Sequence, residues 1–280
     1  MITLPEILED ILKDLQEIGA TPIIVGGSVR DFFLNIPIKD YDIEIFGINS
    51  LEIIQNCLEK FGSVKLVGKS FGVLTLRVNE YDFDFALPRT ETKIGLSHQD
   101  FEVITNASLS FKEAAIRRDF TINAIGYDFF KEEFIDPFDG IEDLKTKTIK
   151  HINDKTFIED SLRVYRAVAF ASRFNFKIEE KTKKLCKQIV LKNELKYLPK
   201  ERVYEEFKKL FLKSSKPSIG FELMREIGIL KYFSELQALI NCIQEPEYHP
   251  EGDVWVHTMM ALDEMARILK EENMEDEYRK

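Results

Sequence analysis

Three aspartates stand in stretches of strand-like sequence. Asp40 and Asp42 flank Tyr41, and Asp84 lies in a run of alternating polar and apolar residues, with Asp82 on the same face as an alternative. Residues two apart in a strand project to the same side, and carboxylate oxygens are the hard ligands that Mg²⁺ prefers. Two such ions roughly 3.5 to 4 Å apart would activate a hydroxyl group and neutralise a departing pyrophosphate. The pattern indicates metal-assisted phosphoryl chemistry.

A glycine turn precedes the first aspartate pair. Gly26 and Gly27 follow the apolar run 22–25 and lead into Arg30. Glycines at a strand-to-helix turn let backbone N–H groups approach a triphosphate, and Arg30 can pair with phosphate oxygens. An aspartate in an alternating strand is by itself more often structural or solvated. The glycine turn and the aspartate pair together favour a nucleotide site.

A second phosphate-binding candidate, Gly68-Lys69-Ser70, fails on spacing. A P-loop needs a glycine six residues before its lysine, and Ser63 stands at that position. The chain also lacks a GxGxxG fingerprint, so dinucleotide chemistry has no support.

Two later clusters combine guanidiniums, carboxylates and amides. RRDFTINA (117–124) contains Arg118, Asp119 and Asn123, which could grip phosphate and ribose or simply cap a helix. EDSLRVYR (159–166) contains Asp160 and Arg163, which share a face of a predicted helix. They could form an ordinary helical salt bridge, or present acceptors and donors to the Watson–Crick edge of a base. The second interpretation would select a nucleotide without a template.

These residues are distributed over an α/β segment and an all-helical segment. Apolar spacing predicts helices at 4–18, 29–34 and 51–58, and strands at 22–25, 41–46, 64–67, 73–78 and 81–87. A polar loop of about twenty residues is expected after Arg89. From Phe157 onward the periodicity is helical, so we expect an α/β head followed by helices.

Length and amino-acid composition limit the class of protein to which the chain can belong. With 280 residues, 44% of them hydrophobic, the chain can form two or three modules with substantial cores. Cys57, Cys186 and Cys242 lack the spacing of a disulfide framework or zinc site. The sequence shows neither a signal-peptide pattern nor an apolar stretch of spanning length, which predicts a cytoplasmic protein with no membrane partner.

Positive charge is concentrated in one segment. Residues 161–216 contain 16 lysines and arginines against six aspartates and glutamates, although the whole chain has a net charge of −10. A lysine run alone is more often a solvated helix surface than a binding stripe.

The motifs in this order resemble the class II tRNA nucleotidyltransferases (CCA-adding enzymes) and bacterial poly(A) polymerases, a branch of the polymerase-β-like superfamily. The resemblance covers most of the chain. It rests on Ile24-Val25-Gly26-Gly27, Asp40-Tyr41-Asp42, RRDFTINA, Asp136-Pro137-Phe138-Asp139-Gly140, EDSLRVYRAVAFASRF, and Glu201-Arg202 through Phe207.

The resemblance implies an α+β fold. A polymerase-β-like nucleotidyltransferase head with a mixed β-sheet and helices would occupy residues 1–145, and an all-α neck and body would follow. The neck, at 146–216, would carry nucleotide-selecting and RNA-binding residues. The body, at 217–280, would be the start of an HD-type domain.

The resemblance also implies roles for individual residues. Asp40, Asp42 and Asp84 would be catalytic and hold two Mg²⁺ ions, while Gly26, Gly27 and Arg30 would contact the triphosphate. The remaining nucleotide-binding residues would be Arg118, Asp119 and Asn123 on phosphate or sugar, Asp160 and Arg163 as a protein template for CTP or ATP, and Arg166 nearby. The loop after Arg89 would help reshape the pocket, and Glu201 and Arg202 would support the neck.

In the same family the basic segment would face tRNA. Lys181, Lys183, Lys184 and Lys187 would then contact RNA phosphates without reading sequence. tRNA and nucleoside triphosphates are the expected partners, and the oligomeric state is not predicted.

The C-terminal segment 248–257 resembles the entrance to an HD-type domain. No histidine in the chain is directly followed by aspartate, so phosphohydrolase activity is not expected and His249 and His257 are interpreted as structural. The leading functional prediction is addition of C and A to tRNA. An enzyme specialised for A or for C, a poly(A) polymerase, and a noncatalytic RNA-binding protein are the alternatives.

Overall fold

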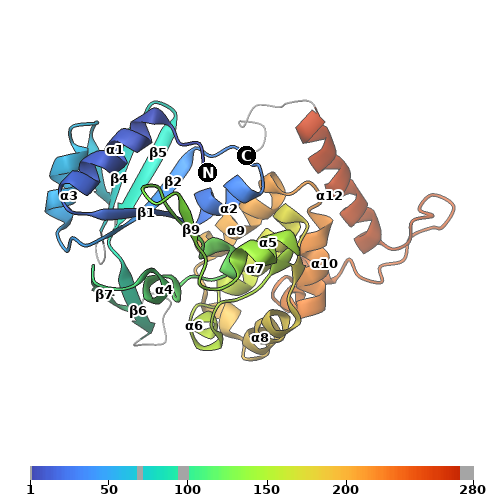
Figure 1. The fold of residues 1–280 in the computed structure, drawn as a ribbon. Helices are drawn as coiled ribbons and strands as arrows, with labels where there is room; N and C mark the ends of the chain where they lie inside the picture. The colour runs from blue at the N-terminus through green and yellow to red at the C-terminus, as the bar shows by residue number, and fades with distance from the viewer. Residues whose placement is uncertain (1, 68–71, 94–100, 272–280) are drawn as a thin grey trace. The chain divides into compact units, whose positions relative to one another are not determined.

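The computed structural model describes residues 2–67, 72–93 and 101–271. The chain divides into two compact units. The head unit comprises Met1–Thr146 and His151–Thr156, and the helical unit comprises Lys147–Lys150 and Phe157–Lys280. Figure 1 colours the sheet of the head mainly blue to green and the helices of the second unit green to red.

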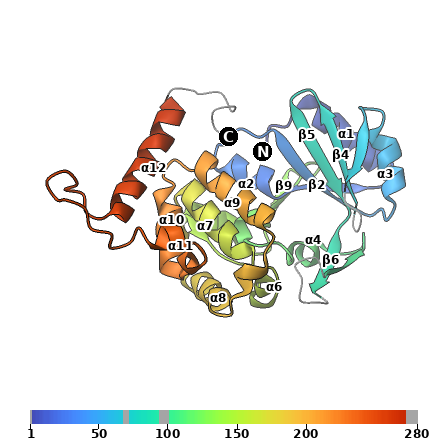
Figure 2. The ribbon, with the colours of Figure 1, turned by 180° about the vertical axis from the view of Figure 1, so that it is seen from behind.

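A mixed sheet of seven strands forms the head unit, in the order β3-β4-β5-β2-β1-β8-β9. β2 and β5 run parallel, and the other neighbouring pairs are antiparallel. β4, β5 and β2 lie side by side in both views (Figures 1 and 2). The predicted mixed-sheet head is confirmed. The strands are β1 Thr21–Val25, β2 Asp40–Phe46, β3 Val64–Val67, β4 Val73–Val78, β5 Tyr81–Ala86, β8 Gly126–Asp128 and β9 Glu133–Ile135.

Short helices complete the head. They are α1 Glu6–Glu17, α2 Gly27–Phe33, α3 Leu51–Leu58, α4 Phe111–Ala115 and α5 Gly140–Lys145, with a 3₁₀ turn at Thr121–Asn123. α1 buries Leu8, Ile11, Leu12 and Leu15, the face predicted by their helical spacing. This face contacts β1 and α3, so the helix closes the core at the sheet.

The segment after Arg89 differs from the prediction. β6 Arg89–Lys93 and β7 Phe101–Thr105 form an antiparallel pair, where a polar loop was expected. β6 has the sequence RTETK, which contains no apolar residue, so a search for apolar alternation misses a strand that backbone pairing forms. Residues 94–100 of the expected loop, and the rejected Gly68-Lys69-Ser70 motif, lie outside the described residues.

The second unit is helical, as predicted from Phe157 onward. α6 Asp154–Glu159 leads into it, and a two-residue parallel pair joins β10 Thr148–Ile149 to β11 Lys177–Ile178. None of the described helices has the length and apolar composition that a membrane span requires. The further helices are α7 Arg163–Phe174, α8 Glu180–Leu191, α9 Lys200–Lys213, α10 Ser218–Ile227, α11 Ser234–Gln237 and α12 Val254–Glu271, with 3₁₀ turns at Glu194–Tyr197 and Ile229–Tyr232.

Candidate active site

The register of two parallel strands brings the predicted carboxylates together. Asp42 of β2 pairs with Asp84 of β5, and Asp40 pairs with Asp82. Asp84 is also opposite Thr75 of β4, whose Oγ1 donates a 2.6 Å hydrogen bond to Asp84 Oδ1. Since Asp40 and Asp42 alternate along one strand, their side chains and that of Asp84 project from the same face of the sheet.

The electrostatics of Asp42 fit a cation site. Its side chain keeps an exposed surface, so an ion can reach its oxygens, yet the surrounding protein desolvates the carboxylate and raises its pKa. Arg118 lowers that pKa, while the charges of Asp84, Asp40 and Glu44 raise it. A divalent cation would relieve this repulsion, and the donor set of carboxylate oxygens suits Mg²⁺.

Asp82, the alternative third carboxylate, has a different partner. It forms an ion pair with Arg77 of β4, at 3.6 Å between Arg77 Nε and Asp82 Oδ1. Asp84 instead borders Asp42 and contributes to the shift of its pKa. The geometry favours Asp84 as the third ligand, and the assignment stays a prediction.

Two structural features favour glycine at position 26. Its φ of 73° lies in the left-handed region that disfavours residues with a Cβ. A Cβ there would also lie 3.0 Å from Arg118 Nη1 and 3.1 Å from Asp42 Oδ2. The absence of a side chain therefore lets the turn, the arginine and the metal-binding candidate approach one another closely.

A buried glutamate, which the sequence analysis overlooked, holds the two arginines of the RRDFTINA motif. Glu44 of β2 is 1% exposed. Arg117 Nη2 donates to Glu44 Oε1 at 2.7 Å, and Arg118 Nη2 contacts Glu44 Oε2 at 3.5 Å. Burial alone would raise the pKa of Glu44, but the two guanidiniums outweigh it and lower the pKa. The sequence could have indicated Glu44, since Asp40, Asp42 and Glu44 occupy alternate positions of one strand.

Arg30, Asp119 and Asn123 form one buried network. Arg30, which is 5% exposed, donates through Nη1 to Asn123 Oδ1 at 2.7 Å and through Nε to Asp31 Oδ1 at 2.8 Å. Asn123 Nδ2 in turn donates to Asp119 Oδ1 at 2.9 Å. These contacts tie α2 to the RRDFTINA segment. Direct contact of the three side chains with phosphate or sugar stays a prediction, because here they bond to one another.

The neck motif departs from the predicted helix. Asp160 lies in a break between α6 and α7, and Arg163 is the first residue of α7. Asp160 Oδ1 accepts from the backbone N–H of Leu162 at 3.1 Å, and Arg163 N donates to Asp160 O at 3.1 Å. The prediction that Asp160 and Arg163 share a helix face was wrong, because the aspartate side chain competes for backbone N–H groups and forms a turn.

Contacts inside the helical unit stabilise this motif. Arg202 Nη2 of α9 donates to Asp160 Oδ2 at 3.4 Å. Arg166 Nη1 of α7 lies 3.7 Å from Glu206 Oε1 of α9. Arg202 thus has the supporting position that the family resemblance implied, and both contacts join the start of α7 to α9.

The four predicted RNA-binding lysines divide into two pairs on α8. Lys181 and Lys184 are exposed. Lys183 and Lys187 instead approach Glu226 of α10, at 3.1 and 3.7 Å. The Lys183 side chain is only 16% exposed, whereas that of Lys187 is 42% exposed, so the contact with Glu226 distinguishes the second pair better than exposure does.

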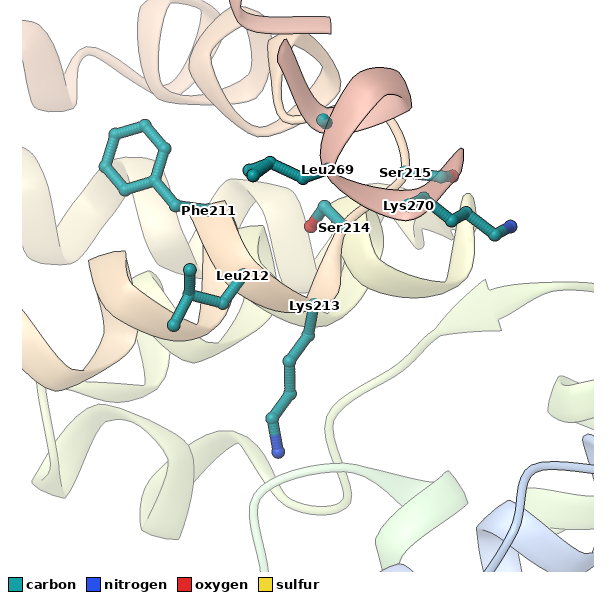
Figure 3. A pocket seen from close by; sticks show the side chains of 8 residues that line it. Phe211, Leu212, Lys213, Ser214, Ser215, Leu269 and Lys270 are labelled. Atoms are coloured by element: carbon teal, nitrogen blue, oxygen red, sulfur yellow. The ribbon is translucent and has the colours of Figure 1, made fainter. Parts of the chain in front are cut away.

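A cavity of about 170 Å³ lies elsewhere in the helical unit (Figure 3). Its lining comes from residues 211–215 at the end of α9 and from Ala266, Leu269 and Lys270 of α12. None of the predicted site residues lines it, so it is separate from the candidate active site.

Comparison with known families matches both units. Residues 23–150 match the poly A polymerase head domain. Residues 175–240 match the family described as a probable RNA- and SrmB-binding site of polymerase A. The first match spans the glycine turn, the aspartates and the RRDFTINA motif, and the second spans α8 to α11.

Individual relatives agree with these matches. A multifunctional CCA protein of Mannheimia succiniciproducens is 39% identical over 88% of this chain and 57% of its own length. A CCA-adding enzyme in its apo form superposes with a TM-score of 0.71 at 31% identity, over 83% of this chain and 55% of the other. A tRNA nucleotidyltransferase bound to a primer tRNA and an ATP analogue gives 0.66 at 31% identity, over 85% and 64%. The chain therefore spans little more than half the length of the curated relative.

Proposed function

Because the chain belongs to the class II family of CCA-adding enzymes and poly(A) polymerases, we propose that it is a template-independent tRNA nucleotidyltransferase. It adds C and A residues from CTP and ATP to the tRNA 3′ end and releases pyrophosphate. The tRNA substrate is also why we expect it to act in the cytoplasm.

The observation that carries this proposal is the register of β2 and β5. Asp42 and Asp84 are direct neighbours on a polymerase-β-like sheet, and Gly26 approaches Asp42 from the turn. This arrangement concentrates carboxylates beside a backbone that can approach a triphosphate closely. The relative named a multifunctional CCA protein and the solved relative with primer tRNA and an ATP analogue support the same substrates.

In this proposal Asp40, Asp42 and Asp84 hold two Mg²⁺ ions. When bound, the ions supply Lewis-acid activation of the tRNA 3′-hydroxyl and neutralise the charge of the leaving pyrophosphate. Arg118 adds positive charge beside Asp42 and the glycine turn, where we place the triphosphate. Glu44 contacts the guanidinium of Arg118 at 3.5 Å and so helps to position it beside Asp42.

Nucleotide choice is assigned to the start of α7. Asp160 offers carboxylate acceptors and Arg163 offers guanidinium donors, which are complementary to the polar edges of C and A. Arg202 holds Asp160 and Glu206 holds Arg166, so both side chains are supported by α9, which packs against α7. Such support is what a site needs to discriminate between bases by hydrogen bonding.

The test is incorporation of labelled CTP and ATP, in the presence of Mg²⁺, on three tRNAs. They end before the CCA sequence, after its first C and after its second C. Stepwise addition of both nucleotides is expected. ATP use on the third tRNA alone would indicate an A-adding enzyme, and C addition alone a C-adding one. Repeated ATP addition would indicate a poly(A) polymerase. Binding of tRNA with no incorporation by the chain would contradict the enzymatic proposal.

A further inference from the structure

Two histidines and a glutamate converge where the loop after α11 meets α12, in the orange and red part of Figure 1. His249 Nδ1 lies 3.1 Å and His257 Nδ1 lies 2.5 Å from the same oxygen, Glu251 Oε1. The two imidazole rings are perpendicular, with centroids 5.1 Å apart. One potential ligand atom from each residue lies within 4.8 Å of the others.

The backbone around this cluster is anchored at several points. Asp253 Oδ2 accepts from Asn241 N at 2.6 Å, and Asp253 Oδ1 accepts from Val256 N at 3.0 Å. Trp255, buried at the start of α12, donates through Nε1 to Glu222 of α10. His257 belongs to the first turn of α12, while the other two residues belong to the loop. The cluster therefore connects a loop to a fixed helix end.

The ligand chemistry fits a transition metal better than Mg²⁺. Two imidazole nitrogens and one carboxylate oxygen are a known three-residue set for Zn²⁺, whereas Mg²⁺ prefers oxygen alone. Zn–N and Zn–O bonds of about 2.0 to 2.1 Å separate ligand atoms in a tetrahedron by roughly 3.3 Å. The 3.1 Å separation is near that value and the 2.5 Å separation is shorter, so a side-chain rotation that moves His257 Nδ1 away from Glu251 Oε1 would admit an ion.

Exposure leaves room for entry and for a further ligand. The His257 side chain is 50% exposed and that of His249 is 31% exposed, so an ion can arrive from solvent. Without an ion the same atoms form a hydrogen-bonded cluster around Glu251 Oε1. Three potential ligands therefore already lie together at a surface that solvent reaches.

We propose that His249, Glu251 and His257 bind one divalent transition-metal ion, with a solvent molecule as fourth ligand, and that this ion fastens the loop to α12. This replaces the interpretation of the two histidines as purely structural. The site is distinct from the carboxylates of the head unit in ligand type and in the metal that it selects.

The test is equilibrium dialysis against Zn²⁺, with bound metal counted by mass spectrometry. Excess Mg²⁺ occupies the oxygen ligands of the head, and a Cys242→Ser background removes the exposed thiol that could also bind zinc. One Zn²⁺ per chain is expected. His257→Ala and Glu251→Gln should each weaken binding at least about tenfold, since each removes a ligand. Glu264→Gln, an exposed carboxylate on the same helix paired with Arg267, is the matched control and should bind normally.

A second measurement separates a ligand role from a folding defect. Saturating Zn²⁺ should raise the unfolding temperature of the Cys242→Ser protein and of Glu264→Gln, because ligand that binds only the folded state stabilises it. His257→Ala should have a normal unfolding temperature without Zn²⁺ and gain nothing from it. No stoichiometric uptake by the parent protein, or equal uptake by His257→Ala, would overturn the proposal.

Discussion

Each unit contains a buried glutamate held by two cations, and the two clusters differ in their surroundings. In the head, Glu44 accepts from Arg117 and contacts Arg118, which also lies beside Asp42. In the helical unit, Glu206 accepts from Lys209 at 2.7 Å and faces Arg166 at 3.7 Å. Glu206 thus pairs with cations on α7 and α9, whereas Glu44 holds an arginine at the edge of an acidic cluster.

This difference in surroundings distinguishes a network that only supports its side chains, in the helical unit, from a cluster suited to binding a cation, in the head. Around Asp42, Asp84 and Asp40, desolvation and like charges raise the pKa of Asp42. Around Asp160, the nearby carboxylate and guanidinium side chains pair with each other. Like charges held together against their repulsion are characteristic of a site that gains stability from a bound cation. We therefore expect chemistry in the head and substrate selection in the helical unit.

The largest expected effect is on chemistry in the head. Asp42→Ala should lower nucleotide incorporation at least about 10³-fold, because it removes metal-binding oxygens, while tRNA affinity remains nearly unchanged. Initial rates with labelled CTP and a gel-shift titration with tRNA measure the two effects. Asp82→Ala is the matched control from the same face, and its ion pair with Arg77 predicts near-normal turnover. Equal losses in both variants would contradict the choice of Asp84 over Asp82.

The two buried glutamates should differ in what they contribute to stability. Glu44→Gln removes the buried negative charge that two guanidiniums face and should lower the free energy of unfolding by about 3 to 5 kcal/mol. Glu206→Gln should cost about 1 kcal/mol, because the Lys209 side chain is 45% exposed and the Arg166 pair is long. Denaturant titration followed by circular dichroism measures both.

Tryptophan fluorescence can show in which unit each variant loses stability. The only tryptophan of the chain, Trp255, lies in the helical unit. Its unfolding signal should shift for Glu206→Gln and shift less for Glu44→Gln if the units unfold separately. A larger loss of unfolding free energy in Glu206→Gln than in Glu44→Gln would show that burial and pairing geometry do not determine how much each glutamate stabilises the protein.

Selection of the nucleotide is expected to show an intermediate effect. Arg163→Ala should reduce discrimination among the four nucleoside triphosphates at least about tenfold, because a hydrogen bond from a charged donor contributes about 1.5 to 3 kcal/mol. Competition between labelled triphosphates measures this ratio. Arg173→Ala, at the other end of α7, removes the same charge where the guanidinium stacks on Phe174 and should leave discrimination intact. Unchanged selectivity in Arg163→Ala would remove that residue from the templating role.

The strands and helices that carry the motifs were largely predictable, because local patterns determine them. Alternation placed Asp40 and Asp42 on one face, and helical spacing located α1 and the helices after Phe157. The pairing of Asp42 with Asp84 depends on strand register, which is a property of two distant segments. The sequence could therefore propose Asp84 and Asp82 together, and only their neighbours Thr75 and Arg77 distinguish them.

The features that the sequence did not predict have a common physical origin, because each depends on polar groups that form hydrogen bonds or ion pairs with one another. Asp160 leaves the predicted helix because its carboxylate accepts the N–H of Leu162. The hydrogen bonds of buried Arg30 to Asn123 and Asp31 were likewise not foreseen, and its contact with phosphate stays a prediction. Glu44 was passed over because a polar residue in a strand is ordinarily exposed, whereas this one is buried beneath two arginines. Apolar periodicity carries no information on such pairings.

The smallest expected effect distinguishes the two lysine pairs of α8. Replacing exposed Lys181 and Lys184 with alanine should weaken tRNA binding and reduce the slope of log affinity against log salt by about 1 to 2, because each phosphate contact releases roughly one counterion. Replacing Lys183 and Lys187 should change the slope less, since Glu226 already neutralises part of their charge. Binding measured over a salt series provides the slopes. If the second pair lowers the slope as much as the first, tRNA displaces Glu226 from these lysines, and the RNA-facing surface of α8 must extend to its contact with α10.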